Sequence, residues 1–419
     1  MALKRFGMLA LLVVLLTALV GSVTAQDPVT LVLWHAKQDA EGDGLLALIE
    51  AFNAQSEGVV VEQVFNPSGT IQDSFRTAAG AGEGPDMIFW ANDSTGEWAR
   101  SNLVLDISGS IPEELQAQVA ESGWGTYTFE GGVYGVPIVA KTLAFFYNKS
   151  LLLDAPETWQ DVLDASAELA ADEGIAGINF QNGFFHSAGF LYALGGSLMD
   201  EDGNAAFAPD TEGFDRMVEY LQFHQDMYNL SEDEANTGVR VNGDSPVPGF
   251  QDQSNPTVAM VYDGIWNLAQ YEQDLGDDLG VALMPVLDNG AVPALFAQTD
   301  GIYANATLAN DEAKLNAYLE FMTFLTSEEG QQIGLEEAGW LPVNPNVSIE
   351  GLPNLEVFAE QFTLGTPFPN RAELSTFWGP MGEAIAAVSA GGEDPAEVAA
   401  RTYEAIQTSI DEIHASSDS

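Results

Sequence analysis

The sequence lacks cysteine altogether and has only 12 lysine and arginine residues against 63 aspartate and glutamate residues. The absence of cysteine excludes disulfides, thiolate metal sites and cysteine nucleophiles. It also excludes a lipid-modified N-terminal cysteine, so we expect the protein to be free in its compartment. The formal net charge of −51 argues against a surface for nucleic acid or anionic lipid. We interpret the dense, dispersed carboxylates as an adaptation to high salt, where counterions screen their repulsion.

Signatures of catalysis are also scarce. The chain has four histidines, and none are spaced as metal ligands on one helix. It has no glycine-rich phosphate loop, no nucleophile elbow and no EF-hand pattern. Pairs of carboxylates for glycoside hydrolysis carry no information in so acidic a chain, because some pair always exists. We therefore predict no catalytic residues, no metal and no cofactor.

The first 25 residues have the pattern of a secretory signal. Lys4 and Arg5 precede an apolar run that begins at Met8, and small residues follow up to Ala25. Because the run is short for a transmembrane helix, we predict a signal peptide over 1–25, cleaved after Ala25. An uncleaved anchor helix is the alternative. No later stretch is apolar enough to span a bilayer, so we expect a soluble periplasmic or otherwise extracytoplasmic protein.

The remaining length suits about two domains of ordinary size. Near the N-terminus, apolar runs and amphipathic stretches alternate, which predicts a parallel sheet with helices on both faces. The predicted strands are 30–34, 59–65 and 86–90, and the predicted helices between them are 43–55 and 71–79.

A second α/β region begins near Thr158, which forms a predicted capping box with Asp161 at the start of a helix. Two acidic stretches rich in glycine or proline, 231–249 and 344–353, predict surface loops. Further predicted strands and apolar runs are 133–138, 143–147, 258–262, 279–284 and 301–304, and further predicted helices are 158–171, 214–228 and 395–413. These patterns predict an α/β protein with two lobes.

Large aromatic side chains follow apolar strands or stand in turns, and they are Trp34, Trp90, Phe184, Phe185, Trp266, Phe377 and Trp378. In open α/β sheets, ligands bind beyond the carboxyl ends of the strands, where Trp90 is expected. An aromatic face matches the apolar C–H face of a sugar ring, and Asn92 and Asp93 would supply polar partners for its hydroxyls. Packing in a core is the alternative for each ring.

Lysine is so rare that each one retained near the predicted crevice is a candidate. Lys37 follows the first predicted strand, and Lys141 follows Pro137 in the region expected to cross between lobes. A ligand contact, an ion pair and a solvated side chain all fit this pattern.

Six sequence blocks occur in the order found in the maltose-binding-protein-like family of ABC-importer solute receptors. The most specific runs from Gly82 to Asp93, GEGPDMIFWAND, and resembles the family segment GxGPDIIFWAHD. The other blocks are 134–138 with 146–149, 158–159, 263–266, 326–330 and 377–378. The resemblance covers essentially the whole chain after the signal.

The resemblance implies two α/β lobes joined by a hinge of crossing strands, the fold of a type II periplasmic binding protein. It places the first lobe over 26–138 and 298–342 and the second over 139–297 and 343–419. The ligand is expected in the cleft between them.

Carried over residue by residue, the resemblance also implies a ligand site. Trp90, Trp266 and Trp378 match stacking aromatics, and Asp93 matches a carboxylate that binds hydroxyls. Phe184 falls where the family has a stacking tyrosine, so the ring is kept and its hydroxyl is lost.

Other positions depart from the family pattern. Gln38 and Asp39 replace an acidic–basic pair, and Lys141 and Asn182 each replace a glutamate. A site built for one polar pattern rejects another, so these changes leave the sugar open. The full predicted ligand-binding set is Lys37, Gln38, Asp39, Trp90, Asn92, Asp93, Lys141, Asn182, Phe184, Trp266, Asp300 and Trp378.

We therefore predict an extracytoplasmic receptor that delivers a di- or oligosaccharide to an ABC importer by hinge closure. Its expected partners are a small-molecule carbohydrate and the importer's membrane permease, with no nucleic acid, and we expect a monomer. The alternatives are a secreted glycoside hydrolase, or the same receptor fold with a polyol, polyol phosphate, amino acid or peptide as its ligand.

Overall fold

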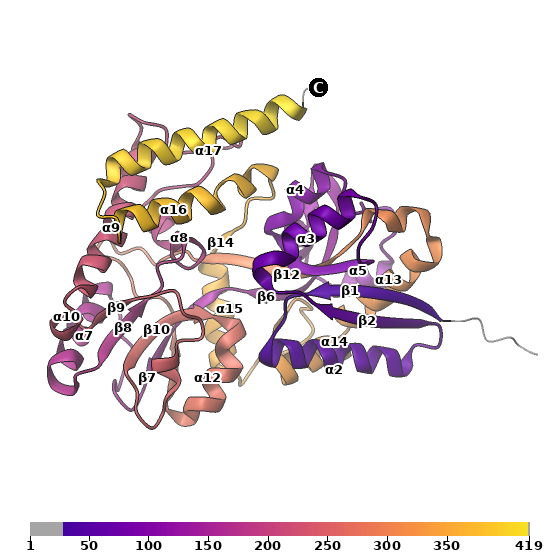
Figure 1. Cartoon of the computed structure of the whole chain (residues 1–419). Coiled ribbons are helices and arrows are strands. Elements are labelled where there is room, and N and C mark those ends of the chain that lie inside the picture. Colours follow the sequence, from indigo (N-terminus) through magenta and orange to yellow (C-terminus); the bar gives the residue numbers. More distant parts are fainter. Residues whose placement is uncertain (1–27, 418–419) are drawn as a thin grey trace, which may run out of the picture.

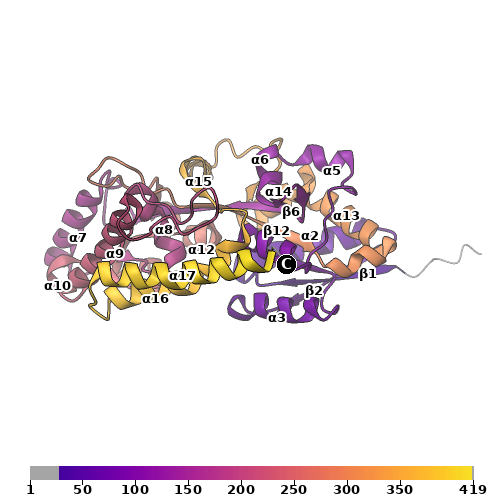
Figure 2. The same cartoon turned by 90° about the horizontal axis from the view of Figure 1, so that it is seen from above.

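The computed structural model describes residues 28–417 and divides them into two lobes that lie side by side (Figure 1, Figure 2). The predicted signal peptide over 1–25 lies outside the described residues. Within them, no helix has both the length and the apolar character needed to cross a membrane.

The first lobe is built on a sheet whose strand order is β13-β6-β12-β3-β1-β2. Strand β1 pairs in parallel with β2 and β3, which confirms the predicted parallel unit. Strand β12 returns from much later in the chain and runs antiparallel to β3 and β6. The strands are β1 (Val29–His35), β2 (Val59–Phe65), β3 (Met87–Ala91), β6 (Gly135–Lys141), β12 (Phe296–Ala304) and β13 (Leu341–Pro342), and β14 (Thr366–Pro367) pairs with the start of β12.

Helices cover this sheet on both faces (Figure 1). The predicted apolar face of α2, with Leu45, Leu48, Ile49 and Phe52, is buried, because these side chains pack on the sheet and on α13. The helices are α2 (Asp39–Gln55), α3 (Ser68–Gly80), α4 (Thr95–Arg100), α5 (Glu113–Gln118), α6 (Glu121–Thr126), α13 (Glu312–Thr326) and α14 (Glu328–Ala338), with short turns η1 (Asn92–Ser94) and η4 (Ala306–Asn310) and a small hairpin of β4 (Thr128–Phe129) and β5 (Gly132–Val133).

The second lobe has its own sheet, with the strand order β11-β7-β10-β8-β9. Its strands are β7 (Leu143–Asn148), β8 (Ala176–Phe180), β9 (Val239–Val241), β10 (Val258–Gly264) and β11 (Leu279–Ala282). Its helices and turns are α7 (Trp159–Glu173), α8 (Phe184–Ala193), α9 (Glu212–Ser231), α10 (Glu234–Thr237), α11 (Pro248–Gln251), η2 (Ile265–Asn267), α12 (Leu268–Leu275), η3 (Gly276–Asp278), α15 (Pro353–Leu364), η5 (Ala372–Thr376), α16 (Trp378–Val388) and α17 (Pro395–Ser417).

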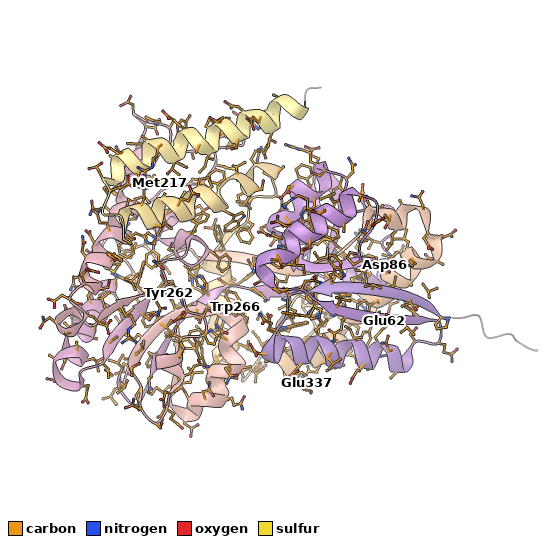
Figure 3. All side chains as sticks on the ribbon, in the orientation of Figure 1. Glu62, Asp86, Met217, Tyr262, Trp266 and Glu337 are labelled. Atoms are coloured by element: carbon orange, nitrogen blue, oxygen red, sulfur yellow. The ribbon has the colours of Figure 1, made fainter. Side chains whose placement is uncertain are left out.

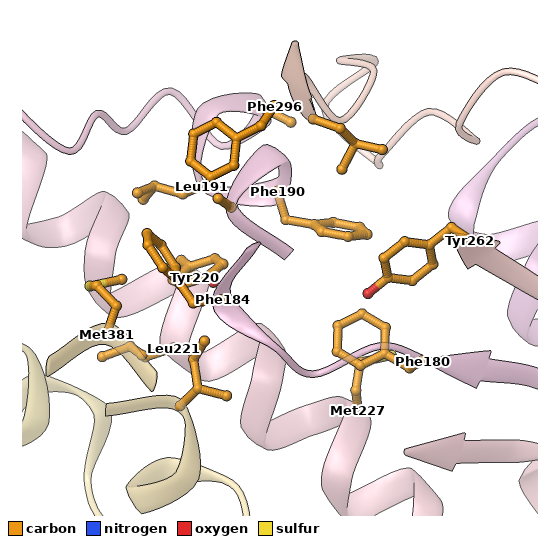
Figure 4. Packing of buried hydrophobic residues seen from close by; sticks show 14 of the residues in the cluster. Phe180, Phe184, Phe190, Leu191, Tyr220, Leu221, Met227, Tyr262, Phe296 and Met381 are labelled. Carbon is orange, nitrogen blue, oxygen red and sulfur yellow. The ribbon is translucent and has the colours of Figure 1, made fainter. Parts of the chain in front are cut away.

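The core of the second lobe is rich in aromatic rings. The ring centroids of Phe190 and Tyr262 lie 5.8 Å apart, and those of Phe180 and Phe190 are separated by the same 5.8 Å (Figure 4). At the start of α7 the predicted capping box is confirmed, because Thr158 accepts a hydrogen bond from the Asp161 backbone and Asp161 accepts one from the Thr158 backbone.

One loop prediction is wrong. The stretch 231–249 was expected as a surface loop, yet it contains α10, the edge strand β9 and the start of α11. Val239 is fully buried and pairs with Ile178 of β8. A strand of only three residues between glycine-rich turns gives too short an alternation to recognise, and its partner strand stabilises it.

Two strands carry the chain between the lobes. Strand β6 belongs to the first sheet, and β7 starts only one residue later, after Thr142, in the second sheet. Strand β12 begins next to β14 and ends between β3 and β6. Residues near these crossings, such as Lys141 and Asp300, therefore lie at the floor of the space between the lobes.

The segment 368–376, which follows β14, also packs against the first lobe. Asn370 donates to the backbone oxygens of Gly125 and Thr128. Buried Glu373 lies 3.5 Å from Arg100 of α4 and 3.1 Å from His414 of α17, whose C-terminal end reaches toward the first lobe (Figure 2). The segment begins with Phe368 and leads into Trp378 at the start of α16, and both side chains line the space between the lobes.

Gly96 makes this close packing possible, and its substitution tests it. A Cβ atom at Gly96 would lie 2.5 Å from backbone atoms of Arg371 and Ala372. Gly96→Ala should therefore lower the free energy of unfolding by about 1–3 kcal/mol, measured by chemical denaturation. Gly69→Ala in α3 is the control, because nothing lies within 4 Å of the added carbon. Equal stability of the two variants would contradict the packing.

Candidate functional site

A cavity of about 900 Å³ lies between the two lobes. Residues of both lobes and of both crossing strands line it. The lining includes Gln38, Asp39, Glu41, Gln72, Trp90, Asp93, Lys141, Phe185, Ser245, Trp266, Asn267, Gln298, Asp300, Phe368 and Trp378.

Trp90 brings an aromatic face to the cavity from the first lobe. It stands near the end of β3, directly before the turn η1, and pairs with Gly301 of β12, which has no side chain to cover it. Its indole Nε1 is buried and has no hydrogen-bond partner among residues 28–417. Trp90 thus lines the cavity, and its polar atom is buried without a partner in the described residues.

Two tryptophans face the cavity from the second lobe. Trp266 follows β10 in the turn η2, at the boundary between the lobes (Figure 3), and its Nε1 donates to Ser245 Oγ at 3.4 Å. Trp378 begins α16, and its ring centroid lies 5.8 Å from that of Phe368. Together with Trp90, these rings give the cavity aromatic walls on both sides.

Two predicted site residues lie elsewhere. Phe184 is buried behind the wall, where its ring packs edge-on against Trp378 at 5.3 Å, and the next residue, Phe185, lines the cavity in its place. Consecutive residues at the start of a helix point in different directions, and no local sequence pattern tells which of the two rings faces the cavity. Asn182 is half-buried beside the loop at Gly243 and does not line the cavity.

Four buried charges form the floor of the cavity. Lys141 Nζ lies 2.6 Å from Glu41 Oε1 and 3.0 Å from Asp300 Oδ2. Lys37 Nζ lies 2.5 Å from the same Asp300 oxygen and 3.5 Å from Glu41. We call Lys37, Glu41, Lys141 and Asp300 the ionic quartet. Both rare lysines are thus in ion pairs, and Lys141 also lines the cavity.

The quartet shifts the titration of its members. Burial alone would raise the pKa of Asp300, but the charges of Lys141 and Lys37 outweigh it and lower the pKa to about 2. The same two lysines hold the pKa of Glu41 below its ordinary value against the opposing effect of burial. Sequence reasoning missed Glu41, because one acid among many carries little signal; its position four residues after Lys37, at the start of a helix, was the one pointer to it.

The remaining polar candidates differ in role. Asn92 is buried, and its Oδ1 accepts a hydrogen bond from the Thr299 backbone at 3.0 Å, so it joins β3 to β12. Gln38 and Asp39 are exposed at the rim. Asp39 has a φ of 48°, a strained conformation of the kind that gathers at binding sites.

Asp93 is a carboxyl group in a poorly solvated place. It lines the cavity, and its Oδ1 accepts a hydrogen bond from Ser94 Oγ at 3.2 Å. Burial raises the pKa of Asp93 to about 7, and the nearby carboxylate of Asp300 adds to this effect. No lysine, arginine or histidine in the described part of the chain forms an ion pair with it.

Two α/β lobes, joined by crossing strands around an aromatic cleft, define the class of type II periplasmic binding proteins. Within that class, the chain belongs to the family of bacterial extracellular solute-binding proteins, whose profile matches residues 36–332.

Several known proteins similar to the chain are named as binding proteins. A maltotriose-binding protein of Pyrococcus abyssi is 25% identical over 84% of this chain and 76% of its own length. A galactooligosaccharide-binding protein of Bacillus subtilis is 21% identical over 92% of this chain and 90% of its own length. The structure of the maltose/maltodextrin-binding domain of Bdellovibrio bacteriovorus, bound to maltotriose, aligns with a TM-score of 0.79 at 21% identity, over 91% of this chain and all of that one.

The pH dependence of the free energy of unfolding should report the protonation state of Asp93. The carboxyl titrates near its model value of 3.8 when unfolded and near 7 when folded, so between these values the folded state binds more protons and loses stability as pH rises. Asp93→Asn removes this loss. Its unfolding free energy relative to the parent should therefore rise by roughly 2–4 kcal/mol between pH 4 and pH 8, measured by denaturant titration. Parallel pH profiles for the two proteins would contradict the assignment.

Proposed function

We propose that this protein is an extracytoplasmic receptor that binds a di- or oligosaccharide between its lobes and delivers it to the membrane permease of an ABC importer. The observation that carries the proposal is one cavity lined by Trp90 from the first lobe and by Trp266 and Trp378 from the second. An aromatic face suits the apolar C–H face of a sugar ring, and the polar groups at the floor suit its hydroxyls.

Hinge closure is the proposed mechanism. The two lobes, over 26–138 and 298–342 and over 139–297 and 343–419, rotate about the crossing strands. A saccharide that touches both walls binds the closed form better than the open one, and therefore shifts the population toward closure. The closed form then docks on the permease.

The remaining expectations complete the proposal. The segment 1–25 directs export and is removed after Ala25, which leaves a monomer in the periplasm or an equivalent extracytoplasmic space. A binding role without catalysis is supported by the similar proteins, which are named for the oligosaccharides they bind. The acidic composition, with a net charge of −51, disfavours nucleic acid as a partner.

The site differs from a maltose site in its polar groups, so the sugar has to be found by titration. Quenching or enhancement of tryptophan fluorescence, measured against a panel of mono-, di- and oligosaccharides and polyols with maltotriose first, identifies it. A cleft that closes on three tryptophans should give a saturable signal with at least one saccharide.

The three tryptophans should each contribute to affinity. Trp90→Ala, Trp266→Ala and Trp378→Ala should each weaken binding of that saccharide by roughly 1–3 kcal/mol, because each removes one buried aromatic contact. Isothermal titration calorimetry measures the loss.

Trp124→Ala serves as the matched control, because Trp124 lies in α6 and does not line the cavity. It should keep the parent affinity, and thermal unfolding should confirm that each variant is folded. Unchanged affinity in all three cleft variants would rule out the assignment of the site, and hydrolysis of the bound saccharide would favour a glycosidase.

A further inference from the structure

The charges that line the cleft do not cancel. The titratable groups in the lining are those of Asp39, Glu41, Asp93, Asp300 and Lys141. Lys37 adds a second positive charge directly behind the lining. Both lysines are held by Glu41 and Asp300 at 2.5–3.5 Å. The ionic quartet is therefore neutral, and two further carboxyl groups, those of Asp93 and Asp39, face the cavity without an ion-pair partner among residues 28–417.

The surroundings of Asp93 favour an incoming positive charge. Its acidic neighbours are Glu97 of α4 and Asp300 of β12. Each is itself paired, Glu97 with Arg76 at 2.7 Å and Asp300 with Lys37 and Lys141, whereas Asp93 has no ion pair in the described residues. The phenols of Tyr127 and Tyr303 lie in the same neighbourhood, and burial raises the pKa of each far enough to keep them neutral. A cation that arrives with the ligand stabilises a carboxyl group in such a place as a carboxylate.

The aromatic walls accept cations as well as sugars. The face of a tryptophan ring attracts a positive charge, most strongly where water is excluded. Within this cleft, Lys141 Nζ already lies 5.3 Å from the ring centroid of Trp266. Trp90 stands three residues before Asp93, and both side chains line the same cavity.

We propose that the cleft selects its saccharide by charge, and binds most tightly a sugar unit that carries a protonated amine next to Asp93. The proposal rests on the saccharide receptor function above and names the class of ligand for the same site. The ammonium group donates a charge-assisted hydrogen bond to the carboxylate, which is stronger than the bond from a neutral hydroxyl. A phosphate or carboxylate on the ligand finds both lysines already paired, and it is repelled by Asp39 and by the ionised form of Asp93.

Calorimetry on matched probes tests this selection. The probes are maltotriose, derivatives in which an amine replaces one hydroxyl of a terminal glucose at each position in turn, and a derivative with a carboxylate in place of the primary alcohol. At low salt near pH 6, at least one amine derivative should bind about tenfold more tightly than maltotriose, and the carboxylate derivative most weakly. Binding of the amine should release protons, seen by comparing buffers of different ionisation enthalpy, because Asp93 ionises.

Two variants distinguish the effect of the Asp93 carboxylate from the effect of the protein's overall negative charge. Asp93→Asn should abolish both the preference for the amine and the proton release. Asp43→Asn removes an exposed charge of α2 outside the cleft and should preserve both. If maltotriose binds and no amine derivative gains affinity, or if Asp93→Asn retains the gain, the inference is overturned and the receptor function stands. If no saccharide of any charge binds, the proposed function fails together with the inference.

Discussion

The ionic quartet is the constraint on which the cleft depends. It joins Glu41 at the start of α2 to Lys141 and Asp300 on the two strands that cross between the lobes. Charges buried this deeply are tolerated only when they are paired, and removal of one partner from such a group typically costs about 3–5 kcal/mol. The end of β1, the start of α2 and both crossing strands are therefore fixed relative to one another. In the proposed hinge closure, the floor of the cleft stays fixed and the walls move.

The aromatic walls of the cleft are connected to the quartet and to the first lobe. Lys141 touches the ring of Trp266 from the floor, so the second lobe meets the quartet through a cation–π contact. On the other side, the segment 368–376 packs on α4 and carries Trp378 toward the first lobe. The aromatic surfaces that would hold a sugar are thus connected to the elements that link the lobes. In the proposed mechanism, binding and closure are coupled because the same side chains take part in both.

Much of this architecture is readable from the sequence, because it depends on local patterns. Alternating apolar runs and amphipathic helices predict the parallel unit of β1, β2 and β3, and the capping box at Thr158 predicts the start of α7. Strand β9 escapes prediction because its three residues gain their stability from β8, which lies far away in sequence. In the site, Trp90 and Trp266 are found because they stand at the ends of strands, and Trp378 is found through the family resemblance. The choice between Phe184 and Phe185, and the participation of Glu41, depend on side-chain direction and long-range pairing, which no local pattern encodes.

The scarcity of lysine has a physical explanation in the structure. Lys37 and Lys141 neutralise the two buried carboxylates of the quartet, and Lys314 Nζ lies 2.7 Å from Asp86, which also accepts a hydrogen bond from the Val32 backbone. A carboxylate in water is stabilised by solvent and counterions, whereas a buried one needs a nearby cation or several hydrogen bonds, as at Asp263. A strongly acidic protein can therefore dispense with most lysine on its surface and keep it at acids such as those of the quartet. By the same argument, a carboxyl group that lines a cavity and has no lysine is a place where the ligand itself supplies the positive charge.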